Sequence, residues 1–377
     1  MRTHAAVLYE REKTQPYAQS LPLIIEEIEL EAPGAGEVLV EIVGAGLCHS
    51  DLSTLNGTLP RPLPMILGHE ASGIIREVGD GVSNIKVDDH VVFSFVPGCG
   101  HCQFCAVGRP ALCENGAKTN MTGTLLNGGV RFRNARGQPV MHYLGVAAFS
   151  QYTVAAQESL IKIEKDVPLD KAALFGCAVL TGVGAVMNTA KVAPGEGVAI
   201  FGLGGVGLSA VMGAKLAGAW PIIAVDLIAS RLELAKQLGA DFAINAGEVN
   251  PIAAVRDLTR GGVEYAFEAV GNTKVLAQAF SATRTGGKTI AIGLPHASQQ
   301  VSISGLALVG LEKTIMGSFM GSAIPRRDIP RLISLYQAGR LPLDMLLSPS
   351  LALEDINEGF DKLAQGTAVR QLVRFNG

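Results

Sequence analysis

The segment from about residue 195 to residue 294 alternates short apolar stretches with helix-like ones, and this constrains the fold more than any other feature. GVAIFGLGG, PIIAVD, DFAIN and KTIAIGL resemble strands, and GVGLSAVMGAKLAGA, ASRLELAKQLGA and PIAAVRDLT resemble helices. Such alternation builds βαβ units, which predicts a parallel, doubly wound sheet. Residues 36–95 predict short strands with turns, whereas 114–141, rich in Asn and Gly, predict irregular structure. The predicted fold class is α/β, with one α/β domain inserted into a β-rich domain.

A glycine motif marks the first of these strand-to-helix junctions. Gly202, Gly204 and Gly207 form G-x-G-x-x-G, with Gly205 inside it, and Asp226 ends the next strand. This context predicts a dinucleotide site whose pyrophosphate meets the helix N-terminus. A carboxylate at Asp226 favours NAD, because it repels a 2′-phosphate, although Arg231 could weaken that preference. The alternatives are a glycine-rich turn without a ligand and, for Asp226, a helix-capping acid.

Four of the six cysteines lie within fifteen residues, CGHCQFCAVGRPALC. Cys99, Cys102, Cys105 and Cys113 fit a closed, tetrahedral zinc site with a structural role. Disulfides, redox switches, an iron–sulfur cluster and unliganded thiols are the alternatives.

The remaining two cysteines lie in separate segments, GLCHSD and FGCAVLTG. Cys48, Cys177 and His69 of LGHE form a Cys–His–Cys set with one open position, which is typical of catalytic zinc. Each is a weak signal alone, because a single Cys or His is often a packed core residue. Beside a dinucleotide motif, the three together predict a second zinc, and therefore two zinc ions per chain.

Composition excludes several classes of protein. The chain of 377 residues has 31 basic and 34 acidic residues without a basic block, which argues against a nucleic-acid partner. The N-terminal MRTHAAVLYEREKTQPYAQS lacks the apolar core of a signal peptide. Residues 172–190 are uncharged, but their Thr, Asn and glycines favour a buried segment over a membrane span. We therefore expect a cytoplasmic protein without a membrane partner.

These motifs, in this order and spacing, resemble those of the zinc-dependent medium-chain alcohol dehydrogenases over nearly the whole chain. The resemblance implies a GroES-like catalytic domain (1–178 and 322–377) with its structural zinc loop at 99–113, and a Rossmann NAD-binding domain (179–321). It implies that Cys48, His69 and Cys177 bind the catalytic zinc, with Glu70 near it, and that Asp51 orients His69. Ser50 matches the hydroxyl that contacts the substrate oxygen.

The resemblance also implies further contacts. His49 and Arg370 match pyrophosphate contacts, and Thr181 and Val206 match positions beside the nicotinamide. The positions that line the substrate pocket or the adjoining cofactor are Phe95, Leu112, Tyr143 and Leu294. An apolar pocket of this kind fits primary aliphatic or aryl alcohols and their aldehydes. The expected reaction transfers a hydride between such an alcohol and NAD.

Two departures from the family pattern matter. Ser53 stands where many relatives have the histidine that ends a proton relay, so the proton could leave through Ser53, water or His49. Ala117, Leu59 and Arg61 stand where glutathione-dependent formaldehyde dehydrogenases hold glutathione. This argues against thiol-adduct (glutathione or mycothiol) formaldehyde oxidation, which stays the alternative, together with a non-catalytic family member.

Two apolar stretches, 301–311 and 313–319, follow KTIAIGL, and the second predicts an added edge strand. Because exposed apolar sheet edges are usually covered, we expect a homodimer paired through this edge, with a homotetramer as the alternative.

Overall fold

The computed structural model describes residues 1–375 and divides into two compact units. The first unit contains Met1–Cys177, Ile324–Ser334 and the chain from Leu347 onward, and the second contains Ala178–Ala323 and Leu335–Leu346. The second unit thus interrupts the first twice. The expected boundaries at 178 and 322 lie within two residues of those in the structure, but Leu335–Leu346, expected in the first unit, pack with the second.

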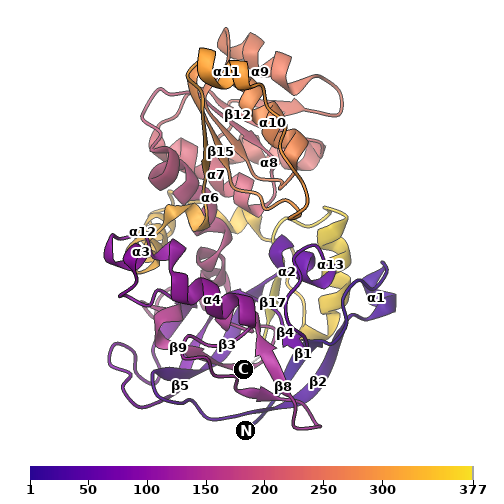
Figure 1. Cartoon of the computed structure of the whole chain (residues 1–377), viewed down its shortest axis with the longest axis vertical. Coiled ribbons are helices and arrows are strands. Elements are labelled where there is room, and N and C mark those ends of the chain that lie inside the picture. The colour runs from indigo at the N-terminus through magenta and orange to yellow at the C-terminus, as the bar shows by residue number, and fades with distance from the viewer. Residues whose placement is uncertain (376–377) are drawn as a thin grey trace. The chain divides into compact units, whose positions relative to one another are not determined.

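The first unit is rich in β-structure, as Figure 1 shows. A closed barrel has the order β1-β2-β7-β8-β4, and an antiparallel sheet has the order β10-β6-β5-β3-β17, with β9 also pairing with β3. The barrel strands are β1 (Arg2–Leu8), β2 (Leu23–Leu30), β4 (Met65–Ile66), β7 (Phe132–Arg133) and β8 (Pro139–His142). The sheet strands are β3 (Glu37–Gly46), β5 (Glu70–Val78), β6 (His90–Phe93), β9 (Tyr152–Ala156), β10 (Leu160–Ile163) and β17 (Leu372–Arg374).

Short helices connect these strands. They are α1 (Tyr17–Ser20), α2 (His49–Leu55), α3 (Gln103–Ala106), α4 (Glu114–Thr122), α5 (Leu169–Ala172) and α13 (Ile356–Ala364), while α12 (Pro325–Gln337) runs from the first unit into residues of the second. Helix α4 corrects the expectation of irregular structure over 114–141. The Cys113 sulfur caps its N-terminus, and Asn120 Nδ2 donates to the Phe95 carbonyl at 2.7 Å, so tertiary contacts stabilise a helix that its Asn and Gly content does not favour.

The second unit is a six-stranded parallel sheet in the order β13-β12-β11-β14-β15-β16. Its strands are β11 (Val198–Phe201), β12 (Ile222–Asp226), β13 (Phe242–Asn245), β14 (Val263–Glu268), β15 (Thr283–Ala291) and β16 (Thr314–Gly317). Numbered within the unit, this is the order 3-2-1-4-5-6 of dinucleotide-binding domains. The predicted doubly wound sheet is confirmed, and 313–319 contributes the predicted edge strand.

Helices alternate with these strands. They are α6 (Ala178–Gly184), a π-helical turn (Ala185–Ala190), α7 (Gly205–Ala217), α8 (Ala229–Leu238), α9 (Pro251–Thr259), α10 (Thr273–Ala282) and α11 (Gly305–Gly310). Helix α7 contacts β11 and β12, and α10 contacts β14 and β15. The core between them includes Phe201, Val225 and Ala279, all at most 2 % exposed. Helix α11 lies within 301–311, where the sequence showed only an apolar stretch.

No single helix within residues 1–375 has the length and apolarity needed to cross a membrane. The bent pair Leu169–Gly176 and Ala178–Ala190, which covers the uncharged stretch seen in the sequence, meets the requirement on length and composition only.

Candidate active site and metal centres

Three segments of the first unit bring Cys48, His69 and Cys177 together. Cys48 precedes α2 in an extended conformation, His69 precedes β5, and Cys177 follows a 3₁₀ turn (Ala173–Gly176). Their ligand atoms all lie within 4.8 Å of one another, and His69 Nε2 lies 3.3 Å from Cys177 Sγ. All three side chains are buried. We call this group the Cys–His–Cys trio.

Asp51 fixes two members of the trio. Its Oδ2 accepts a hydrogen bond from the Cys48 N–H at 3.2 Å, and its Oδ1 accepts from the Gly68 N–H at 3.0 Å and lies 3.2 Å from His69 Nδ1. Gly68 is required here, because its φ is +89° and an added Cβ would lie 2.7 Å from the Phe149 nitrogen. In the neutral imidazole, the carboxylate selects the tautomer that is protonated on Nδ1, which leaves the unprotonated Nε2 facing the two thiols with its lone pair available to a metal.

Interactions among the side chains of the trio and their neighbours favour one thiolate and one imidazolium. A hydrogen bond from Cys177 lowers the pKa of Cys48 well below its usual value, and His69 adds to this against the effect of burial. The hydrogen bond with Cys48, together with burial, raises the pKa of Cys177. Burial opposes a charge on His69, but the Asp51 carboxylate and then Cys48 raise the pKa of His69 overall. A metal must therefore displace protons from Cys177 and His69 when it binds.

The donor set fits zinc. Two thiolates and one imidazole with a fourth position not supplied by the trio are the ligands of a catalytic zinc site. The Ser50 hydroxyl lies beside the trio, since its Oγ is 3.9 Å from Cys48 Sγ.

Glu70 and Arg370 form a buried charged pair beside the trio. Arg370 Nη2 lies 3.8 Å from Glu70 Oε2, and Nη1 donates to the Leu47 carbonyl at 3.1 Å. Although burial opposes its charge, Glu70 and the two thiols of the trio raise the pKa of Arg370 further. The residue expected at a pyrophosphate is thus anchored through Glu70, which the sequence did not reveal. His49, the other expected phosphate contact, is exposed on the first turn of α2.

Two of the four expected pocket residues lie against the trio. The rings of Phe95 and Tyr143 meet the His69 ring edge-on, with centroids 5.4 and 5.7 Å away. Leu112 is half-buried in the cysteine loop, and Leu294 belongs to the second unit and is 54 % exposed. Thr54, which the sequence did not single out, is fully buried and bonds to Tyr143 Oη at 3.2 Å.

The four cysteines of the 99–113 loop form a second cluster. Their sulfur atoms all lie within 4.8 Å, and Cys102 Sγ is 3.9 Å from Cys113 Sγ. A tetrahedral zinc with four thiolates requires sulfur separations of roughly 3.8 Å. Backbone N–H groups of Cys99 and Gly116 point at Cys113 Sγ at 3.3 and 3.4 Å, as expected around a thiolate. The cluster therefore fits the closed zinc site.

The thiols of this loop do not titrate alike. Although burial opposes it, hydrogen bonds from backbone N–H groups lower the pKa of Cys99 to about 6, whereas burial and its thiol neighbours raise the pKa of Cys105 to about 12. Full deprotonation of all four thiols at neutral pH therefore requires a cation.

The glycine motif has the geometry that phosphate binding requires. Gly202 has φ +91°, and an added Cβ on Gly207 would lie 1.8 Å from the Gly202 carbonyl oxygen, so helix and strand approach closely. An added Cβ on Gly204, which caps α7, would meet no atom within 4 Å. The N-terminus of α7 is thus open to a pyrophosphate.

Asp226 stands at the end of β12, where the sequence predicted the ribose contact. Its Oδ2 accepts from the Leu203 N–H at 2.6 Å, and its Oδ1 accepts from the Leu227 N–H at 2.7 Å. The carboxylate is therefore held against the glycine turn and can still accept from ribose hydroxyls. Arg231 is half-buried on α8.

Thr181 and Val206 lie on helices α6 and α7, which are in contact. An added Cβ on Gly182 would lie 2.3 Å from the Val206 carbonyl oxygen. The two residues expected beside the nicotinamide are therefore brought close by one tight helix crossing in the second unit.

Sequence reasoning missed Glu268 at the end of β14. This buried carboxylate accepts from the Val270 and Gly271 N–H groups at 2.8 and 2.7 Å, and burial raises its pKa. It shapes the turn that packs on Gly202, and the backbone of Leu294 packs on Gly271. An acid ending a buried strand, as in VEYAFEAVG, was the signal in the sequence.

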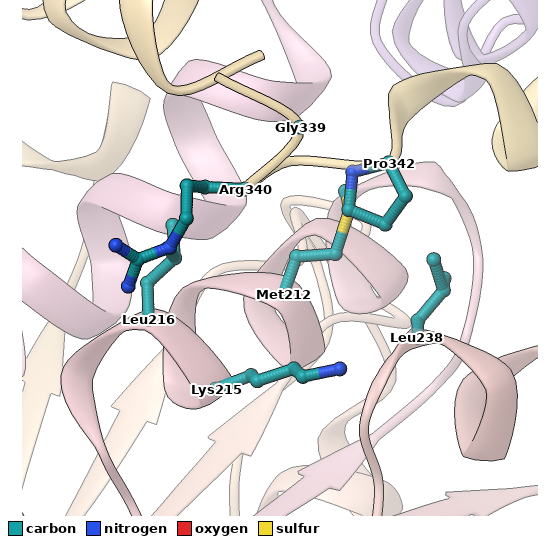
Figure 2. A pocket seen from close by; sticks show the side chains of 7 residues that line it. All are labelled: Met212, Lys215, Leu216, Leu238, Gly339, Arg340 and Pro342. Atoms are coloured by element: carbon teal, nitrogen blue, oxygen red, sulfur yellow. The ribbon is translucent and has the colours of Figure 1, made fainter.

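A cavity of about 310 Å³ lies elsewhere in the second unit, as Figure 2 shows. Its lining residues are Met212, Lys215, Leu216, Leu238, Gly339, Arg340 and Pro342. No predicted site residue lines it.

Comparison with known proteins gives a consistent picture. Residues 34–165 match the alcohol dehydrogenase GroES-like domain, and residues 205–338 match the zinc-binding dehydrogenase family. The chain is 39 % identical to a class-3 alcohol dehydrogenase of Cereibacter sphaeroides and to an S-(hydroxymethyl)glutathione dehydrogenase of Paracoccus denitrificans, with all of each chain covered.

Solved structures agree with this. A zinc-binding alcohol dehydrogenase domain protein of Burkholderia ambifaria superposes with a TM-score of 0.94 at 37 % identity. The benzyl alcohol dehydrogenase of Acinetobacter calcoaceticus superposes with a TM-score of 0.91 at 35 % identity. Both comparisons cover the whole of each chain.

Proposed function

Since this chain belongs to the zinc-dependent alcohol dehydrogenase family, we propose that it oxidises primary aliphatic or aryl alcohols to aldehydes at the Cys–His–Cys trio, with NAD as the electron acceptor. The observation that carries the proposal is the convergence of Cys48, His69 and Cys177 within 4.8 Å, with Ser50 Oγ 3.9 Å from Cys48 Sγ. A proton acceptor therefore stands beside a three-ligand metal site.

Side chains of this chain transfer the proton and orient the metal ligands. Zinc supplies Lewis-acid polarisation of the alcohol, and NAD supplies the two-electron acceptor. Ser50 Oγ accepts the alcohol proton, and Asp51 holds His69 in the tautomer that a metal requires. From Ser50 the proton leaves along α2 through half-buried Ser53, exposed His49 or water.

The side chains at the trio favour an apolar substrate. Phe95 and Tyr143 present rings to His69, and the Tyr143 hydroxyl already donates to the Ser50 carbonyl at 2.9 Å. Phe95 has no hydroxyl and the Tyr143 hydroxyl is already hydrogen-bonded, so these two side chains present an apolar surface to a substrate. An aryl or aliphatic alcohol matches it, and the similarity to benzyl alcohol dehydrogenase supports the same class.

Thiol-adduct formaldehyde oxidation is the second candidate, because one relative is an S-(hydroxymethyl)glutathione dehydrogenase. The residues Ala117, Leu59 and Arg61 argue against it. The Arg61 guanidinium contacts Met121 Sδ at 3.3 Å and would repel the ammonium group of glutathione.

The test is NADH formation with a panel of primary alcohols, and with formaldehyde in the presence and absence of glutathione or mycothiol. The proposal expects turnover of benzyl and aliphatic alcohols without added thiol. Turnover of formaldehyde alone, and only with added thiol, would establish the second candidate. No turnover with any of these, with both zinc sites filled, would indicate a non-catalytic family member.

For the assembly and location of the enzyme, we propose a homodimer in the cytoplasm, where the six free thiols stay reduced. Strand β16 ends the parallel sheet, and on the preceding helix Leu306 and Val309 are 84 % and 78 % exposed. Pairing two copies along β16 would cover this edge and these side chains.

Ile315→Lys tests this interface, because a charge there should dissociate or aggregate the dimer. Lys288→Ala, on the neighbouring strand, is the control. An unchanged mass of the lysine variant by light scattering would place the interface elsewhere, and a wild-type mass of one chain would reject the dimer.

A further inference from the structure

The hydroxyl of Tyr143 is directed at the backbone of α2. Tyr143 Oη donates to the Ser50 carbonyl at 2.9 Å, and Thr54 Oγ1 lies 3.2 Å from Tyr143 Oη and 3.3 Å from the same carbonyl. Tyr143 is 2 % exposed and Thr54 is fully buried. Since each hydroxyl has a single proton, Thr54 shares its proton between Tyr143 Oη and the Ser50 carbonyl, and we call these three groups the Tyr143 triangle.

Hydrogen bonds hold the backbone of Tyr143 in place. It begins a 3₁₀ turn (Tyr143–Gly145) after β8, and its carbonyl accepts from the N–H groups of Val146 and Ala147 at 3.0 and 3.2 Å. The Tyr143 hydroxyl is buried, and the Ser50 carbonyl is its acceptor. The side chain is therefore a fixed anchor for this carbonyl.

Helix α2 requires such an anchor. It has seven residues, and helices this short are marginal without tertiary contacts. Asp51 ties its first turn to His69, but Ser50 lies on this turn and depends on how the turn is held. The Tyr143 ring packs on His69 while its hydroxyl holds Ser50, so one side chain sets the position of the serine relative to the metal-binding histidine.

We propose that Tyr143 and Thr54 are positioning residues that hold Ser50 at the distance from the Cys–His–Cys trio at which its hydroxyl can accept the alcohol proton. The inference rests on the proposed function for the role of Ser50. Tyr143 thus acts through the serine, and its hydroxyl does not contact the substrate.

Tyr143→Phe removes the hydroxyl and keeps the ring against His69. Its kcat for benzyl alcohol should fall on the order of tenfold, because a displaced proton acceptor loses part of its catalytic effect. KM and zinc content should stay unchanged, and the pH profile of kcat should move to higher pH. Hydrogen exchange of the α2 amides should become faster, which is a readout independent of activity.

Thr54 provides an independent pair of variants. Thr54→Val keeps the shape without the hydroxyl and should reproduce the effects of Tyr143→Phe more weakly, whereas Thr54→Ser should retain most of the wild-type kcat. The double variant Tyr143→Phe/Thr54→Val should lose less than the product of the two single losses, because both act on one carbonyl. Tyr9→Phe, which removes a surface hydroxyl bonded to Glu26, is the matched control and should leave kcat unchanged.

Two results would overturn the inference. A raised KM with an unchanged kcat in Tyr143→Phe would place the hydroxyl on the substrate, and unchanged kcat and α2 exchange in both Tyr143→Phe and Thr54→Val would show that the triangle positions nothing. If wild-type enzyme turned over no alcohol, the proposed function would fail. The exchange comparison would then still decide whether the triangle holds α2.

Discussion

Asp51 Oδ1 lies 3.2 Å from His69 Nδ1, with both side chains buried and the same carboxylate bonded to the Cys48 and Gly68 amides. One acid therefore orients an imidazole ligand and fixes the turn that carries a thiol ligand. Residues of this kind tune metal affinity without binding the metal.

Asp51→Asn should weaken zinc binding at the trio by about 10- to 100-fold, because the amide carries no charge to support His69. Competition with a chromophoric chelator measures the change. Asp361→Asn is the control, since Asp361 is also buried and also accepts two backbone hydrogen bonds, from Tyr17 and Ala18. An unchanged zinc affinity in Asp51→Asn would contradict the prediction, because it would show that the Asp51 carboxylate is not needed to orient His69 for the metal.

Freshly purified protein should contain two zinc ions per chain. Cys48→Ser should lose one zinc and turnover while keeping the fold, whereas Cys102→Ser should lose the other zinc and lower the melting temperature, because the four-cysteine cluster ties the two ends of the 99–113 loop together. Elemental analysis together with thermal unfolding distinguishes the two. A single zinc in the wild-type protein would contradict this assignment.

Asp226 should make NAD the preferred cofactor. The measured quantity is kcat/KM with NAD divided by kcat/KM with NADP. Asp226→Gly should lower this ratio by about tenfold or more, because the charge that repels a 2′-phosphate is lost. Asp226→Asn tests the charge alone, since it keeps an acceptor for the Leu203 amide. Asp241→Asn, elsewhere in the second unit, should leave the ratio unchanged. Equal efficiency with NAD and NADP in the wild type would refute the prediction.

His142 should make the first unit sensitive to acid. Burial, with a smaller effect of Arg131, lowers the pKa of His142 to about 3, and its Nε2 accepts from the Arg131 N–H at 3.1 Å. The unfolded chain therefore binds a proton between about pH 6.5 and pH 3 that the folded chain does not. Stability falls as pH falls through this window, by up to about 1.4 kcal/mol per pH unit.

His142→Gln keeps an acceptor for the Arg131 amide but cannot titrate. Its melting temperature should fall less between pH 7 and pH 5 than that of wild type, even if it is lower at pH 7. His4→Gln, on an exposed residue, is the control. A pH dependence equal to that of wild type in His142→Gln would assign the acid sensitivity to other groups.

The parts of the fold that follow from local patterns were predictable from the sequence. Alternating strands and helices predicted the parallel sheet, and PIAAVRDLT predicted α9 at its observed bounds, Pro251–Thr259. The cysteine spacing predicted the loop cluster, because ligands close in sequence need only a local turn. The Cys–His–Cys trio was predicted from its motifs and their order along the chain, because Cys48 and Cys177 are too far apart in the sequence for their spacing to indicate a shared site.

What the sequence did not reveal depends on contacts between distant residues. Helix α4 depends on the Asn120 contact with Phe95, and the partner of Arg370 is Glu70. Tyr143 was predicted as a pocket residue from its position, but its hydrogen bond to Ser50 spans 93 residues and has no local signature. Glu268 is the exception, because its partners Val270 and Gly271 are close in sequence; the acid at the strand end was a signal, but it resembles many other turn residues.

The most direct test of the central claim is to restore zinc to the Cys–His–Cys trio while following alcohol oxidation. A chelator should remove the exchangeable zinc and abolish NADH formation from benzyl alcohol, and activity should return in proportion to the first equivalent of zinc added back. Cys177→Ser, treated identically, should recover nothing. Full alcohol oxidation by protein that lacks the exchangeable zinc, or by Cys177→Ser, would contradict the account.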